Sequence, residues 1–250
     1  MEKIQVIVLA AGKGKRMNSE EIPKVLIEIN NKPIISYVLK AIEASKVCKT
    51  SAIVIGFQKE RVKQTLGNNY IYINQEQQLG TGHAVNVCKE ALENKAENIL
   101  VLYGDHPSIT SSMVKNLAES HLENNNVLTL GTIKVDNFES WKKAFYDYGR
   151  IIRNNKGEVS KIVEKKDCSE AQLKITEVNP SYFCFNANWL WKNLSKIKNN
   201  NSQKEYYLTD LLNLAFIQNQ KITDVYIDPK EGLGVNTLEQ LNDVKNLLFR

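Results

Sequence analysis

Cysteine and proline are scarce in this 250-residue chain, and it has no long apolar run. The four cysteines, Cys48, Cys88, Cys168 and Cys184, lie far apart and form no C-x-x-C pair, which argues against a zinc site or a dithiol redox centre. Cys88 and Cys184 stand in apolar patterns, as small core residues do. The apolar run at residues 6–11 is too short for a signal peptide or a membrane span, so we expect a cytoplasmic protein with no membrane partner.

Charge of one sign is not concentrated anywhere along the chain. The net charge of +5 comes from 33 basic and 28 acidic side chains, and their even spread disfavours nucleic acid as a partner. Hydrophobic residues make up 42% and charged residues 24%, as in an ordinary globular protein. The length allows one large α/β domain with a substantial core, or two small ones.

Apolar strands alternate with helical segments in residues 1–126. β-Branched runs that indicate buried strands cover residues 4–10, 51–56, 70–74 and 98–103. Helical spacing is found at residues 33–44, 59–66 and 82–92. This alternation predicts right-handed βαβ units and a largely parallel sheet.

Residues 127–250 follow a different pattern. Strand-like runs joined by turns cover residues 127–135, 149–154, 159–164 and 180–186. Two helical segments follow, at residues 187–197 and 208–218. We therefore expect a β-rich extension of the first half, with strands that join the same sheet in part.

The loop after the first strand is rich in glycine and basic residues. Open α/β sheets bind ligands at the carboxyl ends of their strands, where this loop begins. Gly12 and Gly14 let the backbone approach a phosphate closely, and Arg16 and Lys24 add positive charge. Met17 stands where a dinucleotide-binding loop needs its third glycine, which argues against an NAD-dependent oxidoreductase. The alternative is an ordinary strand–helix turn.

Two further loops carry polar residues at the same predicted edge. Gln75 precedes Gly80 and Thr81, and a glutamine amide has the donor and acceptor that match a pyrimidine edge. The fourth strand ends at Asp105, whose carboxylate is the kind of oxygen ligand that Mg²⁺ prefers. A glycine-rich helix start and a turn-forming aspartate are the alternatives for each loop alone. Three such loops together favour a nucleotide site.

These motifs and several later ones occur in a single order. They are Leu-Ala-Ala-Gly-Lys-Gly-x-Arg-Met, Pro-Lys-Val-Leu, Gln-x-x-Gln-Leu-Gly-Thr-Gly-His-Ala, Tyr-Gly-Asp, Tyr-Gly-Arg-Ile, Ile-Val-Glu, Glu-Val-Asn, Glu-Tyr-Tyr-Leu-Thr-Asp and Gly-Val-Asn. As an ordered set, from residue 4 to about 241, they resemble the pyrophosphorylase domain of bacterial N-acetylglucosamine-1-phosphate uridyltransferases. The resemblance implies a Rossmann-like nucleotidyltransferase fold, with a mostly parallel central sheet flanked by helices and a β-rich sugar-binding extension. It also implies a single domain over residues 1–250, with a nucleotide-binding half (1–126) and a sugar-binding half (127–250).

The resemblance further implies an activity and its residues. The expected reaction joins UTP and N-acetylglucosamine 1-phosphate, releasing pyrophosphate with the help of Mg²⁺. The nucleotide and phosphate contacts would be Leu9, Ala10, Ala11, Gly12, Tyr103 and Gly104, with Arg16 and Lys24 as the catalytic cations. Uracil would be read by Gln75, Gly80 and Thr81, and the sugar would be held by Gly149, Glu164 and Asn179. Asp105 and Asn236 would bind the metal, and Asn236 would also contact substrate.

Several departures from the family pattern leave alternatives open. Pro180-Ser181 replaces the usual Thr-Gly after Asn179, and His106 replaces a small apolar residue after Asp105. Another sugar 1-phosphate, such as glucose 1-phosphate, or another nucleoside triphosphate therefore remains an alternative substrate. A non-catalytic sugar-nucleotide sensor is a further alternative, which the retained basic residues and metal-binding pair oppose. No hexapeptide repeat is present, so acetyl transfer is not expected, and the oligomeric state is left open.

Overall fold

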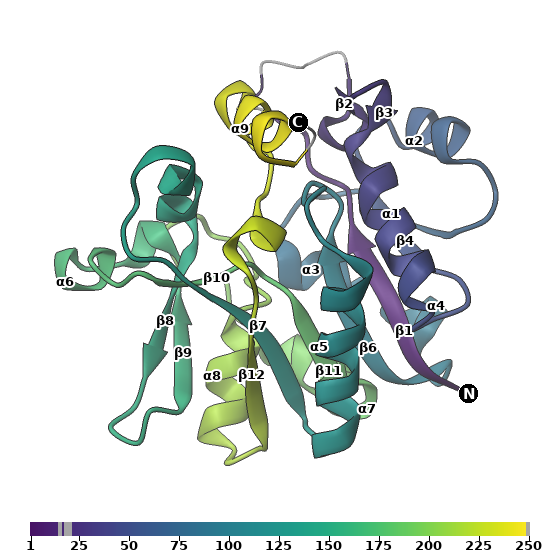
Figure 1. Cartoon of the computed structure of the whole chain (residues 1–250). Coiled ribbons are helices and arrows are strands. Elements are labelled where there is room, and N and C mark those ends of the chain that lie inside the picture. The colour runs from purple at the N-terminus through teal and green to yellow at the C-terminus, as the bar shows by residue number, and fades with distance from the viewer. Residues whose placement is uncertain (15–16, 18–21, 249–250) are drawn as a thin grey trace.

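A large mixed sheet organises the computed structural model, which describes residues 1–14, 17 and 22–248 (Figure 1). The described residues form a sheet of ten strands in the order β5-β4-β1-β6-β11-β7-β10-β8-β9, and β12 pairs with β7. The strands are β1 (Glu2–Leu9), β4 (Ala52–Ile55), β5 (Ile71–Asn74), β6 (Ala96–Tyr103), β7 (Leu128–Lys134), β8 (Gly149–Arg153), β9 (Val159–Val163), β10 (Glu177–Asn179), β11 (Phe183–Asn186) and β12 (Ile222–Tyr226). Two short strands, β2 (Glu28–Ile29) and β3 (Lys32–Pro33), pair separately.

The strands of the first half are parallel and end at one edge. β5, β4, β1 and β6 pair in parallel, and Leu9 at the end of β1 lies opposite Tyr103 and Val54. β1 is buried on both faces, because its side chains at positions 6, 7 and 8 are fully buried. The expected Rossmann-like sheet is therefore confirmed, and its carboxyl edge gathers the loops that follow four strands.

The second half continues the same sheet in mostly antiparallel pairing. β11 lies antiparallel between β6 and β7, so β7 runs in the direction of β6. β10, β8 and β9 extend the sheet beyond β7 by antiparallel pairs. All the strands expected after residue 127 join this sheet, and not merely some of them. The strand expected from residue 180 begins only at Phe183, because Pro180 has no N–H and Ser181 has a φ of 67°.

Helices cover both faces of the sheet (Figure 1). They are α1 (Ile34–Ser45), α2 (Lys59–Leu66), α3 (Thr81–Asn86), α4 (Lys89–Leu92), α5 (Ser111–Asn124), α6 (Glu170–Leu173), α7 (Ala187–Asn193), α8 (Asp210–Ile217) and α9 (Leu238–Leu248). α1, α5 and α9 pack over one apolar core, and α3, α7 and α8 over the other. Residues 82–92, expected as one helix, form two short ones.

One minor expectation, on the cysteines, is confirmed. The Cys88 and Cys184 side chains are fully buried, as expected of core cysteines. Within the described ranges, no helix combines the length and apolar character needed to cross a bilayer.

Candidate active site

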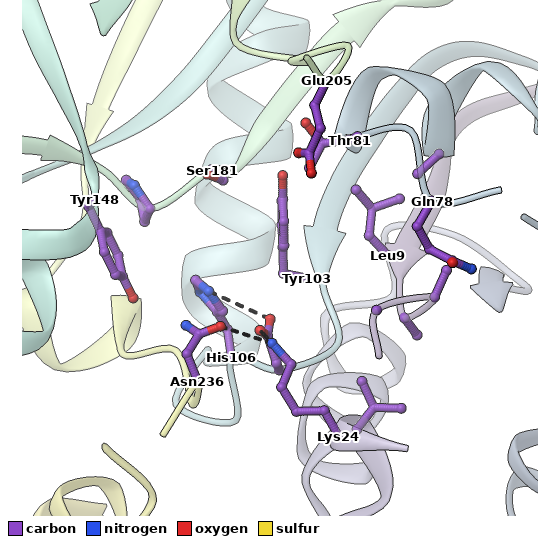
Figure 2. A pocket seen from close by; sticks show the side chains of 18 of the residues that line it. Leu9, Lys24, Gln78, Thr81, Tyr103, His106, Tyr148, Ser181, Glu205 and Asn236 are labelled. Atoms are coloured by element: carbon purple, nitrogen blue, oxygen red, sulfur yellow. Dashed lines mark hydrogen bonds and ion pairs between the residues drawn. The ribbon is translucent and has the colours of Figure 1, made fainter. Parts of the chain in front are cut away.

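A cavity of about 360 Å³ opens at the carboxyl edge of the parallel strands, where the antiparallel extension begins (Figure 2). Its walls include these expected site residues: Leu9, Ala10, Ala11, Gly12, Lys24, Gln75, Gly80, Thr81, Tyr103, Asp105, Gly149, Glu164, Asn179 and Asn236. Gly104 does not line the cavity; its amide hydrogen bonds to the carbonyl oxygen of Leu9 at 3.0 Å and ties β6 to β1. Arg16 lies outside the described residues.

Three expected residues from distant parts of the chain meet at the floor of this cavity. Lys24, at the start of a short 3₁₀ segment (Lys24–Leu26), donates to Oδ2 of Asp105 and to Oδ1 of Asn236, the latter at 3.0 Å. The amide of Val235 donates to the carbonyl oxygen of Asp105 at 2.9 Å, which holds Asn236 beside the end of β6. Backbone pairing thus brings together side chains that are 212 residues apart in the chain.

The carboxylate of Asp105 is held in its ionised form. Burial alone raises the pKa of this carboxyl, but the charge of Lys24, then that of His106, and the hydrogen bond from Lys24 bring the pKa below its usual value. Burial lowers the pKa of His106, while the charge of Asp105 acts in the opposite direction. The floor of the cavity therefore presents a carboxylate and an amide oxygen around a bound ammonium.

This arrangement also fits a divalent cation. Oδ1 of Asp105 is buried and has no hydrogen-bond partner among the described residues. Oδ2 of Asp105 and Oδ1 of Asn236 converge on one positive charge, that of Lys24. Hard cations such as Mg²⁺ take oxygen ligands of these kinds and keep several positions for water or phosphate. The described residues contain no cluster of three or more His, Cys, Asp or Glu side chains suited to a metal ion, so phosphate oxygens would have to complete the ligand set.

The loop after β5 forms the wall opposite the antiparallel extension. The buried amide of Gln75 donates through Nε2 to the carbonyl oxygen of Gly80 at 3.3 Å and to Nδ1 of His83 at 3.0 Å. Gly80 has a φ of 110°, and a Cβ there would lie 2.6 Å from the carbonyl oxygen of Tyr206. The loop can therefore pack against Tyr206 only with glycine at this position. Gln75 is left to meet a ligand with its amide oxygen, an acceptor.

The opposite end of the cavity is built by the extension. Asn179 pairs with Gly149 across β10 and β8, and a Cβ at Gly149 would lie 3.5 Å from the carboxylate of Glu164. Thr209 donates to that carboxylate at 3.0 Å, while burial raises the pKa of Glu164. The side-chain oxygen of Asn179 accepts from the backbone N–H of Ser181 at 2.9 Å. Carboxylate, amide and backbone groups of this kind suit the hydroxyl groups of a carbohydrate.

A family model described as nucleotidyl transferase matches residues 5–230. This chain belongs to the nucleotidyl transferase family. Its relatives include Bifunctional protein GlmU from Clostridium tetani, 40% identical over 242 residues, and from Clostridium novyi, 41% identical over 243 residues. Each match covers 97% of this chain and 51% of the relative, so the chain spans about half the length of these relatives. The resemblance drawn from the motifs is thereby confirmed.

Solved structures show the same nucleotidyl transferase fold. A Bacillus anthracis protein assigned as a glucose-1-phosphate thymidylyltransferase has a TM-score of 0.76 and 17% identity, with 98% of this chain and 94% of that chain covered. A UDP-glucose pyrophosphorylase complexed with UDP-glucose has a TM-score of 0.74 and 19% identity, with 98% of each chain covered. At these identities the likeness supports the fold alone.

The lining of this nucleotidyl transferase includes residues beyond the expected contacts. They are Val25, Gln78, Ala84, Asp147, Tyr148 and Glu205, together with His106, Pro180 and Ser181, where the sequence departs from the family pattern. Most stand within or next to a family motif: Gln78 follows Gln75, Tyr148 precedes Gly149, and Glu205 opens the Glu-Tyr-Tyr motif. Proximity to these motifs is the signal that could have identified them.

Proposed function

We propose that this nucleotidyl transferase joins UTP to N-acetylglucosamine 1-phosphate, giving UDP-N-acetylglucosamine and pyrophosphate. The observation that carries the proposal is one cavity with three chemically distinct parts. Gln75 offers its amide oxygen to a pyrimidine at one end, and Glu164 and Asn179 offer polar groups for a sugar at the other. Lys24, Asp105 and Asn236 lie at the floor, where the phosphates of both substrates would meet.

The reaction requires little proton transfer. An ionised oxygen of the sugar phosphate forms a bond to the α-phosphorus, and the bond from that phosphorus to the pyrophosphate oxygen breaks with its electron pair. No general base is needed, because the attacking oxygen already carries negative charge. Catalysis must instead align two anions and stabilise the charge that develops between them.

Cationic groups of the chain meet this demand. The ammonium group of Lys24 can leave Asp105 and Asn236 and bind a phosphate instead. Arg16 would neutralise the leaving pyrophosphate. Mg²⁺, held by Asp105 and Asn236, would supply further charge stabilisation at the phosphates. The backbone of residues 9–12, which lines the cavity, would orient the nucleotide, and the polar wall at Glu164 would orient the sugar.

The two ends of the cavity come from different parts of one domain, which would bind different substrates. Gln75, Gly80 and Thr81 belong to residues 1–126, which would bind the nucleotide. Gly149 and Glu164 belong to residues 127–250, which would bind the sugar. Asn236 is an exception, because it belongs to residues 127–250 but lies at the cavity floor beside Asp105 of the first half.

Glucose 1-phosphate is the second candidate sugar substrate. The hydrogen bonding of the Asn179 side chain is the observation that favours it. The amide oxygen of Asn179 accepts from the N–H of Ser181, so it offers less to an acetamido group. A single missing hydrogen bond is worth about 1 kcal/mol, or roughly fivefold in preference. The reaction would be unchanged.

Pyrophosphate release tests the proposal. UTP, CTP and dTTP are each combined with N-acetylglucosamine 1-phosphate and glucose 1-phosphate, and kcat/KM is measured for each pair. UTP with N-acetylglucosamine 1-phosphate should be the best pair. Asp105→Asn, which keeps shape but removes charge, should lose on the order of 10²-fold in kcat.

Two outcomes would change the proposal. If no substrate pair releases pyrophosphate but the protein still binds a nucleotide sugar, the non-catalytic sensor replaces the enzyme as the proposal. Glucose 1-phosphate preferred by a wide margin would overturn the sugar assignment while leaving the reaction class intact.

A further inference from the structure

His106 occupies a fixed place beside the two oxygen ligands at the cavity floor (Figure 2). Only 6% of this residue is exposed, and its ring lies 6.2 Å from the Tyr148 ring and 5.7 Å from the Tyr103 ring. The edge of the imidazole also meets Tyr182, at 5.4 Å between ring centroids. Aromatic packing on three sides therefore sets the direction of both ring nitrogens.

Hydrogen bonding determines which nitrogen of His106 carries the proton. The hydroxyl of Tyr182 donates its only hydrogen to the carbonyl oxygen of Glu231, at 3.0 Å. It must therefore accept from His106, whose Nδ1 lies 2.9 Å away. With the proton on Nδ1, the neutral imidazole presents a lone pair at Nε2.

A second unprotonated atom lies near Nε2. Nε2 of His106 lies 3.7 Å from Oδ1 of Asp105, too far for a hydrogen bond. The same carboxylate oxygen is buried and lacks a hydrogen-bond partner among the described residues. Two atoms bound to one ion at about 2.1 Å lie about 3.0 Å apart at a right angle and about 4.2 Å apart when opposite. The observed separation lies between these two values, so both atoms can reach one cation after a shift of less than about 1 Å.

Gly234 packs closely against the Nε2 edge of His106. A Cβ at that position would lie 2.6 Å from Nε2, so only glycine fits there without displacing the ring. The backbone is held there by two hydrogen bonds of the Tyr148 hydroxyl, which donates to the carbonyl oxygen of Gly232 and accepts from the N–H of Gly234. The loop that also carries Asn236 thus holds the imidazole of His106 in place beside Asp105.

We propose that Nε2 of His106 is a nitrogen ligand of the divalent cation, and that this site consequently prefers Mn²⁺ to Mg²⁺. The inference rests on the proposed metal site at Asp105 and Asn236. Imidazole suits borderline transition metals, whereas Mg²⁺ prefers a set of oxygen ligands. A family pattern with a small apolar residue at this position offers the cation no such nitrogen.

Spectroscopy with Mn²⁺ alone tests the ligand without turnover. The full chain is labelled with [¹⁵N]histidine, and the electron spin echo modulation of bound Mn²⁺ is recorded. Modulation that changes from the ¹⁴N to the ¹⁵N pattern on labelling supports the proposal, because histidine nitrogen is then bound to the metal. The label enters the three histidines of the chain, and His106 is the one of these three that lines the cavity.

Two matched variants separate the ligand role from packing. In His106→Asn the amide nitrogen can replace Nδ1 toward Tyr182, while the Nε2 ligand is lost. Its Mn²⁺ affinity, measured by calorimetry, should fall about tenfold or more, with Mg²⁺ affinity changed less than about threefold. In His106→Gln an amide oxygen reaches the position of Nε2, which should bring the ratio of Mn²⁺ to Mg²⁺ affinity toward that of an oxygen-only site.

Each possible result decides the question. Absence of histidine modulation, or an unchanged Mn²⁺ to Mg²⁺ ratio in His106→Asn, would overturn the nitrogen ligand. Asp105→Asn distinguishes this failure from that of the proposed function, because it should abolish Mn²⁺ binding whenever the cation lies at the floor. If Mn²⁺ binding is independent of Asp105, the metal site itself is wrong.

Discussion

At the scale of the residue, Gln75 illustrates how a hydrogen-bond network can orient a recognition group. Both amide hydrogens of its side chain are committed, one to Gly80 and one to His83. The remaining amide oxygen can form a hydrogen bond only with a base that presents a donor to it. Uracil has an N–H at ring position 3, whereas cytosine has a lone pair there, so the wrong base would face acceptor with acceptor.

We therefore expect Gln75→Ala to reduce the preference for UTP over CTP about tenfold, because roughly one buried hydrogen bond and one repulsion are lost. The ratio of kcat/KM for the two nucleotides measures this effect. Gln77→Ala is the matched control, since Gln77 stands in the same loop but is exposed and does not line the cavity. A preference that survives in Gln75→Ala would assign base recognition to other groups.

The candidate site could be predicted from motifs, but its geometry could not. The glycine- and basic-rich loop after residue 9, the glutamine- and glycine-bearing loop after residue 74 and Asp105 after an apolar run together favour a nucleotide site, although each alone has a simpler structural alternative. Asn236 carries no such local signal, because a pairing between Val235 and Asp105 brings it to the floor. The tautomer of His106 likewise depends on Tyr182, which is 76 residues away.

At the scale of the element, the loop from β5 to α3 depends on one close approach. Gly80 lies against Tyr206, whose N–H donates to the carbonyl oxygen of Leu79 at 2.8 Å and whose carbonyl oxygen accepts from the N–H of Gly82 at 2.7 Å. These two hydrogen bonds fasten the proposed uracil wall to the segment before α8. A side chain at position 80 would separate them.

Gly80→Ala should accordingly destabilise the protein by about 2 to 4 kcal/mol, through positive φ and overpacking, and raise KM for UTP. Urea unfolding and steady-state kinetics measure the two effects. Gly67→Ala is the control, because Gly67 also has a positive φ, 79°, but no atom within 4 Å of the added Cβ. Similar losses in both variants would show that backbone conformation, and not contact with Tyr206, controls the loop.

α5 is anchored to the sheet by a buried histidine. Nε2 of His121 donates to Oδ1 of Asn98 at 3.1 Å, because the amide nitrogen of Asn98 is already donating to the carbonyl oxygen of Lys3. Nδ1 then accepts from Thr129 at 2.9 Å. Burial lowers the pKa of His121 to about 4, so the folded protein holds this ring neutral.

Stability should therefore fall as pH decreases from about 6.5 to about 4. In this window the unfolded chain binds a proton at His121 that the folded chain does not, so acid favours unfolding, by about 3 kcal/mol over the whole range. Above pH 6.5 this contribution is fully present. Urea unfolding at several pH values measures the slope, and His121→Gln should remove its share; an identical slope in that variant would contradict the prediction.

The elements differ in how far sequence predicts them. Long apolar runs predicted β1, β4 and β6, because burial on both faces leaves a clear pattern. β10 and β12 were not predicted, since β10 has three residues and β12 is only partly buried, and both exist by pairing with β7. α5 lies outside the predicted helices, although Thr110 caps it and apolar residues recur along one face.

At the scale of the whole molecule, the two proposed halves share a single sheet and both apolar cores. β11, from the second half, is inserted between β6 and β7 and pairs with each. The core beneath α1 and α5 includes Val8 and Leu102 from the first half, and Val178 and Tyr182 from the second. Neither half can lose its structure without exposing apolar surface of the other.

We expect the halves to unfold together in one cooperative transition. The three tryptophans, Trp141, Trp189 and Trp191, all belong to residues 127–250, so their fluorescence reports that half. Cys88, fully buried in residues 1–126, reports the other by its reaction with a thiol reagent in a variant where it is the sole cysteine. Coincident urea midpoints and slopes support one folding unit.

A fragment of residues 1–126 should remain unfolded, because β6 would lose its partner β11 and the sheet its adjoining apolar surface. Separate midpoints, or a folded fragment that binds UTP, would show that nucleotide and sugar binding reside in independent domains.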